Sequence, residues 1–296
     1  MKINKDVETN SIEVESKLLS KSRTLDLEVD LFLEAIFKQY GYDFRHYARS
    51  SLIRRITNCL QREKKSYVSE LIPCLIHDIY FFDRFLQDMS ITVTAMFRDP
   101  HIFNLLNDLV IPKLSTYPTI NIWHAGCATG EEVYSTAILL HESGLLNRTR
   151  IYATDYNNQS LNTAEQGIYP LSKAKQYSEN YQLAGGKFSL SDYYHTTENT
   201  IVIAEQLKDK ITFAHHNLMK DGVFAEMHLI LCRNVLIYFD QVLQDRTLRI
   251  LSESLIHRGF LMLGDRESID FSAVAPLFDK THKKHRIFRK KLFADD

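Results

Sequence analysis

The sequence predicts an α/β domain preceded by a small all-α domain, and three observations lead to that prediction. Apolar residues recur three or four positions apart from Leu27 to about Gln87, which is the period of amphipathic helices. After Pro118 short apolar runs alternate with helical stretches, which indicates βαβ units and a parallel sheet. A chain of 296 residues is long enough to form two separate cores.

The expected domain boundaries follow these changes of pattern. Residues 1–26 are polar and rich in Ser, Lys and Glu, which is typical of a flexible or weakly helical lead-in. Residues 27–88 form the helical domain, with breaks expected near Gly41 and Pro73. Residues 89–296 form the α/β domain.

Four segments of the α/β domain are strand-like and end in small or acidic residues. They read TINIWHAG, TRIYATD, MHLILCRN and GFLMLGD. Parallel sheets are buried on both faces and bind ligands at the carboxyl ends of their strands. We therefore expect the functional side chains to follow these four runs.

A different pattern lies between Gly167 and Asn217. The segment GGKFSLSDYYHTTENTIVIAEQLKDKITFAHHNL contains three short β-prone runs with turn residues between them. It predicts a small antiparallel insert at about residues 170–213.

Composition excludes several classes of protein. The hydrophobic fraction of 45% and the charged fraction of 25% argue against wholesale disorder. The net charge of −1 gives no overall attraction to nucleic acid or membrane. Four cysteines without CxxC spacing argue against a zinc site or a disulfide scaffold and favour a reducing compartment. With no apolar run of signal-peptide or membrane-span length, we expect a protein that is neither exported nor inserted into membranes. We also expect it to be a cytoplasmic monomer.

The loop GCATGEE (126–132) leads from the first strand into a helix. Glycine loops at helix starts often bind phosphate, but Glu131 and Glu132 would repel it. Asp155 ends the next strand, where a carboxylate commonly accepts hydrogen bonds from ribose hydroxyls. S-adenosylmethionine has ribose hydroxyls and a cationic sulfonium but no phosphate. The three carboxylates therefore favour it over a nicotinamide dinucleotide.

Each of these carboxylates also has a purely structural explanation. The glutamates could stabilise the first turn of the helix by about 0.3–1 kcal/mol each. Asp155 could cap the next helix, which begins with the polar run NNQSL. The occurrence of both features at the ends of adjacent expected strands favours a pocket.

Six segments together resemble successive motifs of the CheR family, the chemotaxis receptor glutamate methyltransferases. Their order and spacing match those of the family from about residue 30 to the end of the chain. The segments are TVTAMFRDPHIFNLL (92–106), GCATGEEVYSTAILL (126–140), IYATDYNNQSLNTAEQGIY (151–169), HHNL (215–218), LCRNVLIYFD (231–240) and GFLMLGDRES (259–268).

The resemblance implies a class I, Rossmann-like methyltransferase domain that depends on S-adenosyl-L-methionine (SAM). It implies transfer of the methyl group to glutamate side chains of chemoreceptors, with S-adenosyl-L-homocysteine (SAH) and glutamate methyl esters as products. The residues that the resemblance places around the cofactor are Thr92, Thr94, Arg98, Glu131, Asp155, Asn217, Leu218, Asn234 and Val235.

This chemistry asks little of acids and bases. A substrate glutamate, with a reference pKa of about 4.3, is already an ionised nucleophile at neutral pH, so no general base is required. Alignment of the reactants can supply about 7–11 kcal/mol. Arg98 is the expected catalytic residue that holds the incoming carboxylate, and Tyr238 is expected to orient it by a hydrogen bond. For Arg98 the alternative is a salt bridge to Asp99.

Three departures from the family pattern bear on this interpretation. Thr92 stands where the family usually has asparagine, Val133 where it usually has proline, and GDRES (264–268) where it usually has a Gly-His-Ser-Glu run. The departures at Thr92 and at residues 265–266 keep open an alternative function, that of a catalytically silent sensor or scaffold that binds SAM or SAH. A methyltransferase of the same fold that acts on a small acid or on nucleic acid is a further alternative.

Residues 45–65 hold seven Lys or Arg against one acid, Glu63. A solvated helix face is the usual explanation and nucleic-acid binding is an alternative, but Tyr47 and Tyr67 alone could stack on bases. The resemblance implies a docking face for the glutamate-rich cytoplasmic helical bundle of a chemoreceptor. The expected docking residues are Arg45, Arg49, Arg54, Arg55 and Arg62.

The β insert matches the position of the subdomain that binds a receptor's C-terminal peptide in some members of the family. An exposed edge such as NTIVIAEQ (199–206) could accept an added strand, or the insert could be only a lid. Two histidine pairs, His215–His216 and His282/His285, lack a convergent acidic or thiolate partner in the sequence. We therefore expect no metal site.

Overall fold

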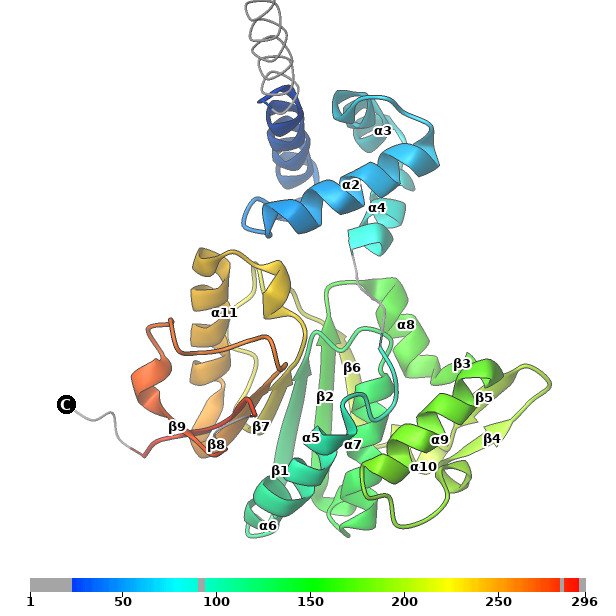
Figure 1. Ribbon diagram of the computed structural model, residues 1–296, viewed down its shortest axis with the longest axis vertical. Helices are drawn as coiled ribbons and strands as arrows, with labels where there is room; N and C mark the ends of the chain where they lie inside the picture. Colours follow the sequence, from blue (N-terminus) through cyan, green and yellow to red (C-terminus); the bar gives the residue numbers. More distant parts are fainter. Residues whose placement is uncertain (1–22, 90–93, 283–284, 293–296) are drawn as a thin grey trace, which may run out of the picture. The chain divides into compact units, whose positions relative to one another are not determined.

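The computed structural model describes residues 23–89, 94–282 and 285–292 and divides the chain into two compact units, Met1–Met89 and Ser90–Asp296 (Figure 1). Two expectations fall outside the described residues. They are Thr92 as a cofactor contact and the character of residues 1–22 of the lead-in. The two units are described separately below.

The first unit is a set of helices around an aromatic core. Its elements are a helix over residues 23–40, α2 (Arg49–Glu63), the 3₁₀ turn η1 (Val68–Glu70), α3 (Leu71–His77) and α4 (Phe81–Met89). The ring of Phe32 is buried and lies edge-on to Phe85 and Phe81, with centroid distances of 5.2 and 6.5 Å. Such edge-to-face pairs add to the stabilisation from burial.

The first expected helix break is present, and the second lies earlier than expected. Gly41 has a φ of +75° and donates its N–H to Phe37 O, which ends the first helix in the left-handed conformation that favours glycine. Near Pro73 the expectation is wrong, because α2 ends at Glu63 and Lys64 takes the left-handed cap. Pro73 lies in the first turn of α3, where its missing N–H costs no helical hydrogen bond.

The second unit contains a seven-stranded sheet in the order β6-β2-β1-β7-β8-β10-β9. The five strands from β6 to β8 are parallel, and β10 is antiparallel to both of its neighbours. The expected α/β domain with a parallel sheet is therefore confirmed. The strands are β1 (Ile120–Ala125), β2 (Thr149–Asp155), β6 (Ile211–His215), β7 (Met227–Cys232), β8 (Leu255–Leu263), β9 (Phe278–Lys280) and β10 (Ile287–Lys290).

Helices accompany the sheet (Figure 1). Helix α7 follows β1 and buries nine of its residues, from Glu131 to Leu140, as expected for a helix inside an α/β core. It and α8 contact β2, while α11 contacts β8. The helical elements are α5 (Pro100–Leu105), the π-helical turn η2 (Leu106–Val110), α6 (Ile111–Leu114), α7 (Glu131–Glu142), η3 (Leu146–Arg148), α8 (Asn158–Gln166), η6 (Leu236–Tyr238), α11 (Gln241–Glu253) and η7 (Ala275–Leu277).

The order of the strands creates a switch point beside β1. From β1 the chain moves outward through β2 to β6, and it then returns to the other side of β1 to form β7 and β8. The carboxyl ends of β1 and β7 therefore carry loops that diverge in opposite directions. Open α/β sheets bind ligands in the crevice at this position.

The insert is a three-stranded antiparallel sheet in the order β3-β5-β4, with helices beside it. Its elements are β3 (Ile168–Pro170), η4 (Leu171–Lys173), α9 (Ala174–Leu183), η5 (Leu190–Tyr193), β4 (Tyr194–Thr196), β5 (Thr200–Ile203) and α10 (Glu205–Lys208). Two expectations are wrong. The NTIVIAEQ segment forms the central strand β5 rather than an edge, and residues 211–213 belong to β6 of the main sheet.

Within the described residues, no helix combines the length and the apolar composition needed to cross a membrane.

Candidate active site

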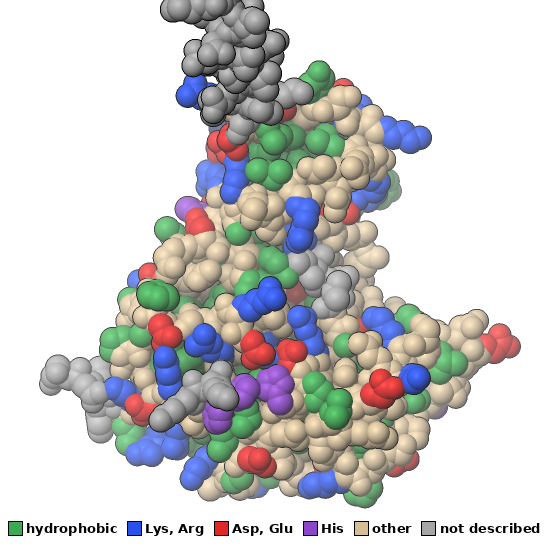
Figure 2. Space-filling model, in the orientation of Figure 1, with side chains coloured by type: hydrophobic (Ala, Val, Ile, Leu, Met, Phe, Trp, Pro, Cys, Tyr) green, Lys and Arg blue, Asp and Glu red, His purple; other side chains and the backbone are tan. Residues whose placement is uncertain are grey.

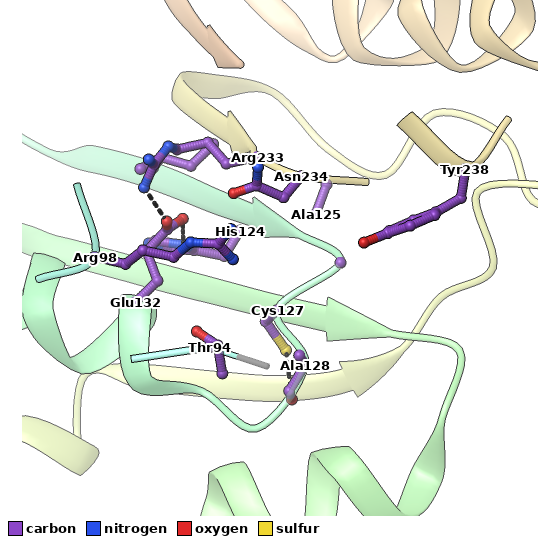
Figure 3. A pocket seen from close by; sticks show the side chains of 12 residues that line it. Thr94, Arg98, His124, Ala125, Cys127, Ala128, Glu132, Arg233, Asn234 and Tyr238 are labelled. Atoms are coloured by element: carbon purple, nitrogen blue, oxygen red, sulfur yellow. Dashed lines mark hydrogen bonds and ion pairs between the residues drawn. The ribbon is translucent and has the colours of Figure 1, made fainter. Parts of the chain in front are cut away.

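A cavity lies at the switch point beside β1 (Figure 3). It is formed by the segment before α5, the end of β1 with the loop that follows it, the first turn of α7, and the end of β7 with the residues after it. The lining residues are Thr94, Arg98, His124, Ala125, Gly126, Cys127, Ala128, Glu132, Leu231, Arg233, Asn234 and Tyr238.

The loop after β1 is held against its neighbours by close packing. Gly126 and Cys127 both donate their N–H groups to Thr154 O, at 2.8 and 2.9 Å. Gly126 has a φ of +79°, and a Cβ atom there would lie 2.6 Å from Cγ2 of Val235. Glycine is therefore required where the loop after β1 meets the residues after β7.

Asp155 supports the same loop from the end of β2. Its Oδ2 accepts the N–H of Ala128 at 2.9 Å, and its Oδ1 accepts the N–H of Asn157 at 3.0 Å. Burial raises the pKa of Asp155, while these backbone donors act in the opposite direction. A carboxylate offers about four acceptor positions, so Asp155 can also accept bonds from a ligand's hydroxyl groups.

A buried charge network crosses the cavity wall. The Arg233 side chain is 1% exposed and donates to Asp99 Oδ2 at 2.6 Å and to Glu132 Oε2. His124 Nδ1 lies 3.5 Å from Glu132 Oε1 (Figure 3). Burial acts to raise the pKa of Glu132, but the charge of Arg233 and the hydrogen bond from His124 outweigh it and lower the pKa to about 2. Glu132 is thus an ionised carboxylate whose charge is already compensated.

The two glutamates of the TGEE motif have different roles. Glu131 is absent from the cavity lining, and its side chain is 1% exposed. It accepts hydrogen bonds from Thr129 Oγ1 at 2.6 Å and Tyr177 OH at 3.2 Å, and Lys173 Nζ lies 3.6 Å away. Glu131 is thus buried against the insert, and the charge of Glu132 is already paired with Arg233. The binding of a cationic ligand by Glu131 stays a prediction.

Glu267 holds the residues that follow β7. Its carboxylate accepts the backbone N–H groups of Gly264 at 2.6 Å, Asn234 at 3.0 Å, Val235 at 2.8 Å and Ile237 at 3.3 Å. Burial raises the pKa of Glu267, while these donors act to lower it. Asn234 has a φ of +60°, which is uncommon for a residue other than glycine. Glu267 thus supports a strained turn at the cavity wall.

The two expected catalytic residues both reach the cavity. Tyr238 points toward the loop after β1 in Figure 3. Arg98 is 41% exposed, and its Nε lies 3.9 Å from Asp99 Oδ2, whereas Asp99 makes its 2.6 Å contact with Arg233. Asp99 therefore interacts more weakly with Arg98 than with Arg233, which argues against Arg98 serving mainly as the salt-bridge partner of Asp99.

The residues expected around a cofactor fall into two groups. Thr94, Arg98 and Asn234 line the cavity. Glu131, Asp155, Asn217, Leu218 and Val235 lie outside its lining. Their contacts place some of them beside it, since Val235 packs against Gly126 and His216 N–H donates to Asp155 O just before Asn217.

Several lining and supporting residues were missed from the sequence. His124, Cys127, Arg233 and Glu267 had no assigned role, although Arg233 adjoins Asn234 in the CRN motif. No described residue offers a hydrogen bond to His124 Nε2, although His124 is 2% exposed. A buried polar atom of this kind calls for a partner, and a ligand in the cavity can supply it.

In the first unit, the expected basic face is only partly basic. Arg55 is 5% exposed and donates to the carbonyls of Asp88 and Met89, so its assignment to a docking face is wrong. Arg54 is exposed on the same helix. The other three arginines pair with acids, Arg45 with Glu34 and Asp43, Arg49 with Asp26 and Asp30, and Arg62 with Glu63 and Asp88.

Comparison with known proteins identifies the family of both units. Residues 92–286 match the model of the CheR methyltransferase SAM-binding domain, and residues 27–90 match that of the CheR methyltransferase all-alpha domain. The chain is 48% identical to Cher3 of Pseudomonas putida over 92% of this chain and all of that one. It is 29% identical to the chemotaxis protein methyltransferase of Listeria innocua over 82% of this chain and 92% of that one. It is 33% identical to chemotaxis protein methyltransferase 2 of Pseudomonas aeruginosa over 62% of this chain and 66% of that one.

Proposed function

The chain belongs to the CheR methyltransferase family and uses SAM, and on this premise we propose that it methylates glutamate side chains of chemoreceptors. The products are glutamate methyl esters and SAH. The observation that carries the proposal is the convergence of Arg98, Asn234 and Tyr238 on one cavity at the switch point of the sheet.

The residues present fit this cofactor. Thr94, Arg98 and Asn234 would surround its methionine end at the cavity, where the buried His124 Nε2 can meet a polar group. Asp155 would accept the ribose hydroxyls with its remaining lone pairs, and Asn217 and Leu218 would contact the adenine. When bound, SAM supplies an electrophilic methyl group on a sulfonium.

The chain's own contribution to the reaction is alignment. A glutamate carboxylate is ionised at neutral pH, so no side chain has to remove a proton. SAM would supply the methyl group that this carboxylate oxygen accepts, and SAH would be the leaving group that keeps the electron pair of the carbon–sulfur bond. Arg98 would hold the incoming carboxylate and Tyr238 would orient it, while the charge network of Arg233 keeps the cavity wall rigid.

The first unit is proposed to dock on the cytoplasmic helical bundle of the receptor. Arg54 is exposed on α2, and Lys64 and Lys65 are exposed just after this helix. They can attract a glutamate-rich surface, with effects mainly on association rate and partner choice. Arg45, Arg49 and Arg62 contribute less to this attraction because acids of the same unit already pair with them.

The insert offers a second contact. Its outer strands, β3 and β4, each pair on one side with β5, so a receptor's C-terminal peptide could extend the sheet at either of them. A cytoplasmic monomer is the form proposed to act, since the receptor surface that it would methylate is cytoplasmic.

The function is tested by supplying the full chain with radiolabelled SAM and membranes that contain receptors of the same organism. Base-labile methyl label on the receptor is expected. Arg98→Ala should remove the label, whereas Arg150→Ala, a change at an exposed arginine on β2, should not. Label on small acids or nucleic acid, and not on the receptor, would contradict the proposed substrate class.

The same protein preparation distinguishes the proposed enzyme from a catalytically silent sensor. Calorimetry with SAH reports whether the cavity binds the product. Binding without transfer by the wild-type protein would contradict the proposed reaction and favour the sensor.

A further inference from the structure

Three side chains from distant segments meet at the surface of the second unit. None of them has a role in the site described above. His101 is in the first turn of α5, Asp265 follows β8, and His285 precedes β10. Each offers one ligand atom, and the three atoms lie within 4.8 Å of one another. Figure 2 shows histidine side chains gathered on one face of this unit with acidic side chains nearby.

The sheet itself brings two of the three together. In the antiparallel β8–β10 pair Met262 lies opposite Ile287, and Leu263 N–H donates to Arg286 O at 2.9 Å. His285 precedes the start of β10, where Ile287 N–H donates to His285 O at 2.9 Å, and Asp265 follows the end of β8. The two residues therefore lie just beyond the same end of the β8–β10 ladder.

Helix α5 supplies the third residue. His101 Nε2 lies 3.7 Å from Asp265 Oδ2, and the rings of His101 and His285 have a centroid distance of 4.8 Å. The side chains of His101 and Asp265 are 47% and 48% exposed, so solvent and ions reach them. The convergent acidic partner that the sequence did not reveal for His285 is thus present in the structure.

The three groups match the ligand chemistry of a divalent transition-metal ion. Imidazole nitrogen and carboxylate oxygen bind zinc at about 2.0–2.2 Å, which in a tetrahedral site separates two ligand atoms by about 3.4 Å. The His101–Asp265 distance is near this value already, and exposed side chains can rotate to close the remainder. Three protein ligands leave the fourth position to water.

We propose that His101, Asp265 and His285 form a binding site for a divalent transition-metal ion of the zinc type. The ion would join the start of α5 to the end of β8. Both segments bear on the cavity, because Asp99 pairs with Arg233 and Gly264 donates to Glu267. The inference does not rest on the proposed substrate.

The neighbouring residue His282 shapes the site without being one of the three ligands. Its Nδ1 accepts the backbone N–H of His285 at 3.3 Å, and the two rings have a centroid distance of 4.8 Å. This contact fixes the backbone next to His285.

The test uses the full chain without a polyhistidine tag. Titration calorimetry with Zn²⁺ is expected to give one ion per chain, and Co²⁺ is expected to give the visible absorption of a tetrahedral site with nitrogen and oxygen ligands. Loss of an outer-sphere partner costs about 10–100-fold in metal affinity, so loss of a ligand in His101→Ala or Asp265→Asn should cost at least about tenfold. His195→Ala, at an exposed histidine of β4, should leave the affinity unchanged.

Circular dichroism checks that each variant remains folded, and His285→Ala provides a third, independent substitution. The proposal is overturned if the wild-type protein takes up no stoichiometric Zn²⁺, or if the three variants bind it as the wild type does. A thiolate-to-cobalt charge-transfer band would place the ion on cysteine and would overturn it equally.

Discussion

The carboxylate of Glu267 accepts the backbone N–H of Asn234 at 3.0 Å and thereby supports a residue with a φ of +60° at the wall of the cavity. The same carboxylate accepts three further N–H groups from the two loops that meet there. The turn that presents Asn234 and Tyr238 thus depends on a buried acid with no place in the cavity lining.

Substituting this acid should affect stability and ligand binding together. Glu267→Ala leaves several buried donors without an acceptor, and each orphaned donor costs about 1–3 kcal/mol. We expect the free energy of unfolding to fall by about 3 kcal/mol or more and SAH affinity to fall with it. Urea unfolding and calorimetry measure the two, with the exposed Glu253→Gln as control. Unchanged SAH affinity would contradict the positioning role.

The buried pair of Glu132 and Arg233 predicts a dependence of stability on pH. The pKa of Glu132 is lowered from 4.5 to about 2, so the folded state holds the proton less tightly than the unfolded chain does. Its stabilisation, on the order of 3 kcal/mol, is present above pH 4.5 and is lost as the pH falls toward 2. Unfolding free energies measured from pH 7 downward should fall less steeply for Glu132→Gln than for wild type. Parallel curves would contradict the assignment.

Arg98 should matter for turnover rather than for folding. Its side chain is 41% exposed and its Nε lies 3.9 Å from Asp99 Oδ2, and exposed ion pairs contribute little to stability, so Arg98→Ala should change the urea midpoint little. Poor alignment of the incoming carboxylate should slow methyl transfer by about 100-fold or more. Initial rates with receptor membranes measure this. Arg98→Lys should recover only part of the rate, because an ammonium lacks the forked geometry. Near-normal turnover of the alanine variant would remove Arg98 from its proposed role.

Alanine substitutions at two neighbouring arginines of α2 should affect different properties of the protein, stability in one case and receptor binding in the other. Arg55 is buried and bonds to two backbone carbonyls, so Arg55→Ala should destabilise the first unit by about 2–4 kcal/mol. Arg54→Ala should change stability by less than about 0.5 kcal/mol but raise KM for the receptor and weaken its salt dependence. Urea unfolding and methylation kinetics at two ionic strengths separate the two outcomes. A KM that stays the same in Arg54→Ala would argue against docking through this face.

Much of the architecture was predictable because it is encoded locally. Helical periodicity from Leu27 to Gln87 and the alternation of apolar runs after Pro118 identified an all-α domain and an α/β domain. The runs ending at Ala125, Asp155 and Cys232 form parallel strands β1, β2 and β7, and the carboxyl ends of β1 and β7 adjoin the cavity. Edge and centre could not be told apart in the insert, because each strand's pattern is the same whether one neighbour or two pair with it.

By itself, the sequence determined the family, the cofactor class and the segments that carry the site, since motifs and periods lie within short stretches of chain. Only the tertiary structure decided which side chains of these segments line or support the site. Neighbours on a helix point about 100° apart, so Glu132 faces the cavity while Glu131 is buried, and Arg54 is exposed while Arg55 is buried. Partners such as Arg233 and Asp99, or Asp265 and His101, are far apart in the chain, and only folding brings them into contact.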